Sequence, residues 1–270
     1  MDNSAIYRKI DEPNEFIPMK IKVLASSSKG NSTYIESGNT KLLIDVGVSY
    51  PYLLRELEQI SISPLDLDGI LITHTHADHI KGLQSLVKRT NIKVYTIEEM
   101  IPELVEKIPQ SNIQSLSAIT EIKDFKVEYI RTSHDVVSVG YILEDNHSSL
   151  VYITDTGYIN RKLFNKISNK KIYILESNHD EKMLMNGPYP YILKQRILSD
   201  KGHLSNHTAA SYLKDIVGDN TEYIVLAHLS EHNNTVELAY QATKEILDEN
   251  HLEKTLIIAK PNESLETIEV

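Results

Sequence analysis

The stretch His74-Thr75-His76-Ala77-Asp78-His79 is the most informative part of this sequence. It follows an apolar, β-branched run of the kind that forms buried strands. Since alternate residues of a strand point the same way, His74 and His76 can bind one metal ion. Asp78 and His79 then begin a predicted helix and can turn toward a second ion. The alternative is a polar loop whose histidines are solvated.

Six predicted strands run directly into a residue that can bind a metal ion or a proton: Asp45, His74, His134, Asp155, Glu176 and His228. Buried strands end where the backbone leaves the core, and residues at these ends can point into a shared crevice. We therefore expect His134, Asp155 and His228 to be further ligands, with Asp155 bridging two ions. Asp45 is predicted to orient a ligating imidazole through its other ring nitrogen. The alternatives are structural histidines and plain turn aspartates.

The composition restricts the chemistry and the setting of the protein. The 270-residue chain has no cysteine, so any metal ion must be held by His, Asp and Glu. A formal net charge of -10 argues mildly against a protein that tracks long duplexes, although bound cations would add positive charge where phosphates lie. The N-terminus lacks an apolar signal segment, and apolar runs are too short to span a membrane. We expect a cytoplasmic protein of a bacterium or phage, with no membrane partner.

Short apolar runs alternate with amphipathic patterns between an N-terminal extension at 1–18 and an acidic tail at 261–270. One compact domain at 19–260 is the default. Strands are predicted at 19–24, 33–37, 41–45, 69–73, 92–96, 122–131, 139–143, 150–154, 171–176, 222–227 and 255–259. Helices are predicted at 50–59, 78–89, 97–107, 159–167, 181–186, 190–199, 206–217 and 235–249. This mixture indicates an α+β arrangement of sheets covered by helices.

Over residues 19–260 the chain resembles the metallo-β-lactamase superfamily. The resemblance rests on Leu24-Ala-Ser-Ser-Ser-Lys-Gly-Asn-Ser32, Ile44-Asp-Val-Gly47, Thr73-His-Thr-His-Ala-Asp-His79, Thr132-Ser-His134, Thr154-Asp-Thr-Gly157, Glu176-Ser-Asn-His-Asp180, Gly202-His-Leu-Ser-Asn206 and His228-Leu-Ser-Glu231. The stretch from Glu176 through Pro188-Tyr-Pro and Lys194-Gln-Arg196 to Asn206 is similar to the WalJ/YycJ-like branch, which is related to tRNase Z and RNase J-type nucleases. The resemblance implies a four-layer αββα sandwich with metal ions at one edge between the sheets.

The resemblance also implies a ligand set and a cofactor. The first ion would be held by His74, His76, His134 and Asp155. The second would be held by Asp78, His79, Asp155 and His228. Zinc is the usual occupant in the superfamily, and manganese is the alternative for nuclease-like members. The oligomeric state stays open, with a homodimer as one option.

Metal chemistry and the resemblance together suggest a mechanism. Two ions, with Asp78 among the catalytic ligands, would hold a bridging hydroxide that attacks a phosphoryl group in line. His203 resembles the residue that protonates the leaving oxygen in tRNase Z-like phosphodiesterases, and Glu176 would hold its tautomer. Alternatively, His203 merely precedes a helix that Ser205 caps. Candidates for substrate contact are Ser26, Ser28, Asn31 and His179. The alternative for Ser26, Ser28 and Asn31 is a plain turn between two strands. The alternative for His179 is a helix capping box in the segment 178–181.

The leading functional prediction is a nuclease, specifically an exonuclease, that hydrolyses phosphodiester bonds of DNA or RNA. A phosphodiesterase for small or cyclic nucleotides is the runner-up, and the charge balance suits it better. A lactonase, thioesterase or β-lactamase would use the same ligands, but Asp78 beside His79 and the segment around His203 argue against these activities. A non-catalytic binding module is the remaining class, and it would be expected to have lost a ligand position.

Overall fold

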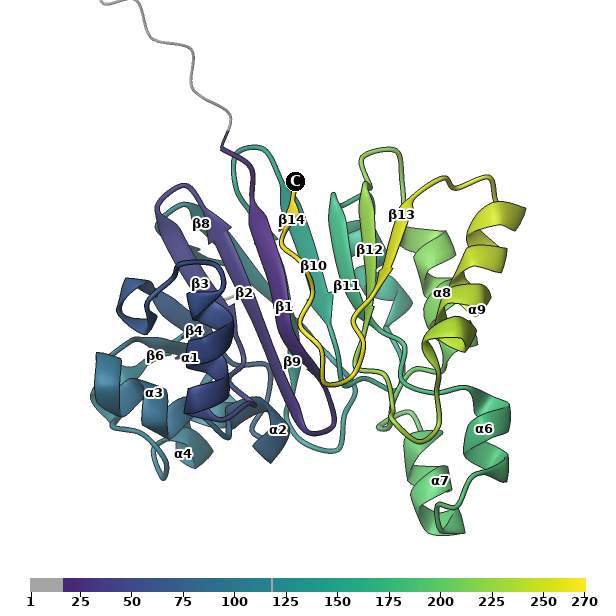
Figure 1. Ribbon diagram of the computed structural model, residues 1–270, viewed down its shortest axis with the longest axis horizontal. Coiled ribbons are helices and arrows are strands. Elements are labelled where there is room, and N and C mark those ends of the chain that lie inside the picture. Colours follow the sequence, from purple (N-terminus) through teal and green to yellow (C-terminus); the bar gives the residue numbers. More distant parts are fainter. Residues whose placement is uncertain (1–16, 118) are drawn as a thin grey trace, which may run out of the picture.

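The computed structural model describes residues 17–117 and 119–270, which form two facing seven-stranded sheets (Figure 1). The first sheet has the order β14 (Ile268–Glu269), β1 (Lys20–Ser27), β2 (Gly30–Ser37), β3 (Thr40–Ile44), β4 (Gly69–Leu71), β5 (Val94–Thr96) and β6 (Ile113–Ser115). The second has the order β13 (Thr255–Ile258), β12 (Tyr223–Ala227), β11 (Ile172–Glu176), β10 (Ser149–Ile153), β9 (Val139–Glu144), β8 (Phe125–Arg131) and β7 (Ile119–Ile122). From β3 to β6 and from β10 to β13, neighbouring strands are parallel.

Helices cover the outer faces of both sheets, so the molecule has four layers (Figure 1). The first half carries α1 (Tyr50–Glu58), α2 (Ala77–Ile80), α3 (Leu83–Thr90) and α4 (Ile101–Leu104). The second carries α5 (Phe164–Ile167), α6 (Glu181–Asn186), α7 (Tyr191–Ile197), α8 (Asn206–Ile216) and α9 (Val236–Glu249). One apolar core lies between the sheets and beneath α1 and α3, and another lies between the second sheet and α8 and α9. The expected αββα sandwich is confirmed. None of the described helices is long and apolar enough to cross a membrane.

Four predicted elements are divided in the structure. The helices expected at 97–107 and 159–167 each consist of a 3-10 turn followed by a short α-helix, α4 or α5. The strand expected at 122–131 is part of a hairpin, because Lys123 turns the chain with φ 51° between β7 and β8. The helix expected at 78–89 breaks at Gly82, whose N–H donates to Val46 O at 2.8 Å. A Cβ at Gly82 would lie 2.2 Å from Val48 O, so this close approach requires glycine.

The structure describes the C-terminal end of the chain in full and the N-terminal end from residue 17 onward. The expected extension at 1–18 lies, except for its last two residues, outside the described part of the chain. The expected tail at 261–270 contains β14, which pairs antiparallel with β1. Ile268 and Val270 are buried there. The last residues therefore add an edge strand to the first sheet.

Candidate metal centre

The six residues expected at strand ends gather at one edge of the sandwich, where the carboxyl ends of the parallel strands meet. Three of them have a left-handed backbone, with φ 60° at Asp45, 56° at Asp155 and 56° at His228. Aspartate and histidine tolerate this region better than most residues, but it is still sparsely populated. Such conformations persist where the surrounding fold imposes them, and they cluster at functional sites.

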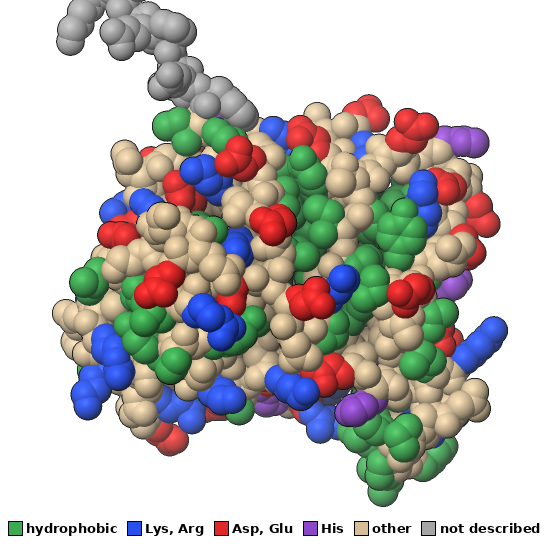
Figure 2. Space-filling view, viewed as in Figure 1, with side chains coloured by type: hydrophobic (Ala, Val, Ile, Leu, Met, Phe, Trp, Pro, Cys, Tyr) green, Lys and Arg blue, Asp and Glu red, His purple; other side chains and the backbone are tan. Residues whose placement is uncertain are grey.

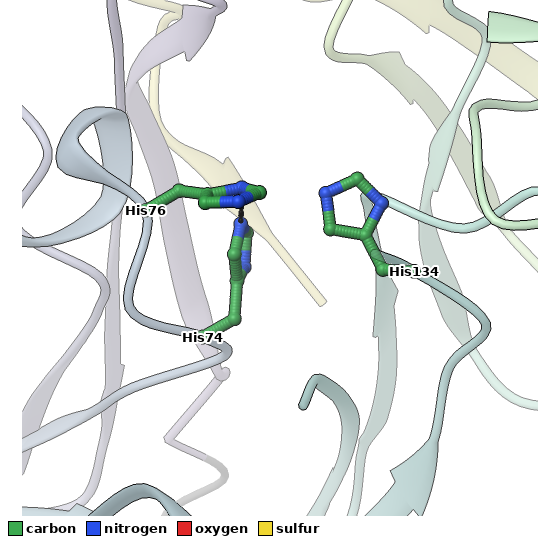
Figure 3. A group of neighbouring side chains, drawn as sticks. All are labelled: His74, His76 and His134. Carbon is green, nitrogen blue, oxygen red and sulfur yellow. Dashed lines mark hydrogen bonds between the residues drawn. The ribbon is translucent and has the colours of Figure 1, made fainter. Parts of the chain in front are cut away.

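His74, His76 and His134 form the first donor cluster, with two imidazoles from one half of the sandwich facing the third from the other half (Figure 3). His74 Nε2 lies 3.1 Å from His76 Nδ1, and one nitrogen of each ring lies within 4.8 Å of the others. Burial lowers the pKa of His74 and of His134. Both rings are therefore held in the neutral form, in which imidazole binds metal ions.

Asp78, His79 and His228 form the second donor cluster. Asp78 Oδ2 lies 3.6 Å from His79 Nε2 and 3.9 Å from His228 Nε2. Asp155 stands between the two clusters: its Oδ2 is 3.2 Å from His79 Nε2, and its Oδ1 is 4.0 Å from His134 Nε2. An aspartate in this position can offer one oxygen to each of two neighbouring ions.

Asp45 is fully buried and supports the second cluster from behind. Its Oδ2 lies 2.7 Å from His79 Nδ1, and its Oδ1 accepts the Thr73 N–H at 2.8 Å. Because Nδ1 of His79 is engaged in this way, Nε2 faces Asp78 and Asp155. This is the position from which a carboxylate orients a metal-binding imidazole.

Glu176, at the end of β11, contacts two histidines at once. Its Oε1 lies 2.8 Å from Nδ1 of His203 and 2.8 Å from Nδ1 of His228. Its Oε2 accepts the Leu204 N–H at 3.0 Å. Burial raises the pKa of Glu176, but the two imidazoles outweigh burial and lower the pKa to about 2. The sequence analysis expected the contact with His203 but not the one with His228.

The donor atoms fit divalent metal ions. Asp155 Oδ2 and His228 Nε2 are buried and have no hydrogen-bond partner among the described residues. A buried polar atom without a partner is costly, and a cation between the clusters would satisfy both atoms. The donors are imidazole nitrogens and carboxylate oxygens, which suit zinc and other first-row divalent ions.

Three of the candidates for substrate contact lie at the end of β1, in the turn that follows it and in β2. Ser28 is exposed at the turn between β1 and β2. Ser26 is buried, and its Oγ accepts the His228 N–H at 2.7 Å, so it supports the start of that loop. Asn31 is also buried, with its Nδ2 3.0 Å from His79 Nε2. Of these three side chains, Ser28 is the one that solvent reaches readily.

His179, the fourth candidate, lies in the loop between β11 and α6. Its side chain is buried, and neither ring nitrogen has a partner within the described chain. Burial lowers the pKa of His179 to about 4, so the ring is neutral. Asp180 caps α6 by accepting the Met183 N–H at 2.8 Å. The helix cap considered for this segment is therefore present beside His179.

Asp135 and Arg196 were not among the residues predicted for the site, although Arg196 belongs to a segment that carries the family resemblance. Asp135 Oδ1 lies 3.4 Å from His76 Nε2 and 3.3 Å from His134 Nε2. Its Oδ2 lies 2.5 Å from the guanidinium of Arg196 on α7. An acid directly after His134 was a visible signal. Nothing in the sequence connected it to an arginine 61 positions away.

Comparison with known proteins identifies the family. The β-lactamase superfamily domain matches residues 40–229. The chain is 38% identical to exodeoxyribonuclease YycJ of Bacillus anthracis over 237 residues, covering 86% of this chain and 90% of the relative. It is 38% identical to exodeoxyribonuclease WalJ of Streptococcus pneumoniae serotype 2 over 232 residues, covering 83% and 86%. The fold matches the metallo-β-lactamase fold protein YhfI of Bacillus subtilis with a TM-score of 0.73 at 19% identity, covering 94% and 100%. The chain belongs to the metallo-β-lactamase superfamily, within its YycJ/WalJ-like branch.

Proposed function

We propose that this chain is a divalent-metal-dependent phosphodiesterase that hydrolyses DNA from an end. The observation that carries the proposal is the contact of 2.8 Å between Glu176 Oε1 and His203 Nδ1, beside the two donor clusters. The sugar oxygen that leaves a phosphodiester needs a proton, and a histidine held by a carboxylate can deliver one. The YycJ and WalJ relatives, which align over 86% and 83% of this chain, are named exodeoxyribonucleases.

The metal ions would be held by side chains from both halves of the sandwich. One ion would take His74, His76, His134 and Asp155, and the other would take Asp78, His79, Asp155 and His228. When bound, such ions act as Lewis acids toward phosphoryl oxygens and activate water. Zinc suits this imidazole-rich donor set, and manganese is the second choice.

His203 would act as the acid for the leaving group. Its Nδ1 is engaged by Glu176, so its Nε2 is the nitrogen that can carry a proton to the substrate. Burial lowers the pKa of His203, but the Glu176 carboxylate outweighs burial and raises the pKa above its ordinary value. This shift favours the protonated form that an acid requires. Glu176 would position this proton without touching the substrate.

Hydrolysis of small or cyclic nucleotides is the second candidate. The formal net charge of -10 favours a short substrate over a long one. Figure 2 shows acidic and basic side chains interspersed over the face in view, with no continuous basic surface there. Lactone and thioester hydrolysis ranks below both, because the relatives that align over most of this chain are named exodeoxyribonucleases.

The test compares substrates for the metal-loaded protein. End-labelled DNA, end-labelled RNA, cyclic nucleotides, a lactone and a thioester are each incubated with zinc-loaded and manganese-loaded chain. We expect DNA to be shortened from one end, and Asp78→Ala to lose both turnover and part of the bound metal. Asp219→Ala, at an exposed aspartate in the turn before β12, is the matched control. Turnover of a lactone or thioester with every phosphodiester left intact would refute the proposal.

A further inference from the structure

Helices α6 and α7 form an arm that projects from the second half of the sandwich beside the metal centre (Figure 1). The arm is fastened internally, since Lys194 Nζ on α7 donates to Met185 O at 2.7 Å and to Gly187 O at 2.8 Å. It returns to the body at Gly202, where a Cβ would lie 2.1 Å from Ile197 O. In Figure 2, apolar side chains gather at the same lower-right corner.

A cavity of about 260 Å³ lies between this arm and the donor clusters. Its inner wall contains His134 and His203. The arm contributes Tyr189, Arg196 and Lys201. The turn between β1 and β2 contributes Ser28, and further lining comes from Asn178, Leu193, Ile197, Gly202 and Ser230. The cavity thus joins the metal-binding residues to one aromatic ring and two cationic side chains.

We propose that this cavity holds the terminal nucleotide of a DNA strand, and that the arm stops the strand so that cleavage releases one nucleotide at a time. The inference rests on the proposed function, because it names the part of the substrate that this same site receives. It assigns base stacking to Tyr189 and contact with a backbone phosphate to Arg196. Holding a single nucleotide in this way does not require a long basic groove, which suits an acidic protein.

The chemistry of the wall fits a nucleotide. The ring of Tyr189 is fixed by an edge contact with His232, at a centroid distance of 5.9 Å, and a fixed ring loses little entropy when a base stacks on it. One amino group of Arg196 is engaged by Asp135 at 2.5 Å. The guanidinium has five N–H donors, so others remain for a phosphate oxygen. Lys201 adds a second cation to the same wall.

The size and the boundaries of the cavity favour an end over an internal segment. Its volume of about 260 Å³ is just under the ~300–1,000 Å³ of pockets that enclose drug-sized ligands, so it has room for no more than about one nucleotide. A strand that continued past the metal centre in this direction would meet α7 and the segment up to Gly202. Because the arm is tied to the body through Arg196 and Asp135, moving it aside would break that ion pair.

The test uses linear single-stranded DNA and a covalently closed circle of the same sequence, with the metal-loaded full chain. We expect mononucleotides from the linear strand and no cleavage of the circle. Tyr189→Ala should raise KM for linear DNA about tenfold with little change in kcat, and Tyr189→Phe should restore it, since phenylalanine also stacks. Arg196→Ala should reduce the slope of log(kcat/KM) against log salt by about 0.7, the value for one phosphate contact on a single strand.

Tyr191→Ala is the matched control, because Tyr191 is on the same arm, is 69% exposed and does not line the cavity. It should behave like the wild-type chain, and all variants should bind equal amounts of metal. The inference is overturned if the linear strand is degraded from an end to oligonucleotides instead of mononucleotides, or if Tyr189→Ala and Tyr191→Ala have the same KM. Failure of the proposed function would look different, because the wild-type chain would then cleave neither DNA or would cut the circle as fast as the linear strand.

Discussion

Glu176 Oε1 and His203 Nδ1 lie 2.8 Å apart, and the same carboxylate oxygen lies 2.8 Å from Nδ1 of His228. One buried side chain therefore fixes both the proposed leaving-group acid and a proposed metal ligand. The two histidines also approach one another, with ring centroids 5.4 Å apart. If the proposed roles are right, proton delivery and metal binding are coupled through Glu176, and substitutions at these positions should separate the two roles.

His203→Ala should reduce turnover while leaving the metal centre occupied. General acid catalysis contributes a factor of about 10²–10⁴, so kcat on DNA should fall by that amount. His203 is not a proposed ligand of either ion, and His228 keeps its contact with Glu176. Metal analysis should therefore give the wild-type stoichiometry. Full turnover with normal metal content would exclude His203 as the acid.

Glu176→Gln should lower both turnover and metal affinity. Glutamine has the same shape but no charge, so it holds neither imidazole as strongly. Loss of a carboxylate that orients a ligand lowers metal affinity about 10- to 100-fold. Competition with a chromophoric chelator would measure this change alongside kcat. If the substitution lowered kcat but left metal affinity unchanged, the contact between Glu176 and His228 would have no part in metal binding.

The positions of the donors could be predicted because metal ligands need rigid attachment and a restricted set of side chains. His74, His76, Asp78 and His79 are close in sequence, so a strand followed by a helix brings them together without knowledge of the rest of the fold. The position of His228 was harder to predict, since this residue reaches the site only because of the order of the strands in the second sheet. Its place at the end of a predicted strand and the family resemblance were the two signals that pointed to it.

Contacts between distant side chains could not be predicted in the same way. Arg196 lies on a short helix whose own pattern says nothing of Asp135, and the ion pair depends on how the arm folds back. The pairing of β14 with β1 is similar, because Ile268 and Val270 are isolated apolar residues in an acidic segment. Local periodicity identifies long elements, whereas a two-residue edge strand has no period to detect.

Metal binding should release protons near neutral pH. In the metal-free chain, burial lowers the pKa of His79, but Asp45 and Asp155 outweigh burial and raise the pKa to about 10. The pKa of His228 is also raised, chiefly by the charge of Asp155. His79 is then protonated at neutral pH, and the raised pKa of His228 favours a proton there too. These protons must be lost when the rings bind metal. The release should disappear only as the pH rises through about 10. Calorimetric titration with zinc in buffers of different ionisation enthalpy would count the protons, and a count of zero would contradict this prediction.

Deleting residues 268–270 should destabilise the fold without changing the metal centre. The deletion removes β14 and the buried side chains of Ile268 and Val270, and it also removes the carbonyl that accepts the Ser148 hydroxyl at 2.8 Å. Burial of each apolar side chain contributes about 1.5–3 kcal/mol, so the free energy of unfolding should fall by roughly 3–6 kcal/mol, with the lower end favoured because the unfolded chain already buries some apolar surface. Figure 1 places β14 at the opposite end of the sandwich from α2, so metal content should be retained. Urea unfolding measures the loss.

Glu269→Ala, at an exposed position of the same strand, should change stability by less than about 0.5 kcal/mol. An equal effect of the two changes would mean that the edge strand contributes nothing to the fold.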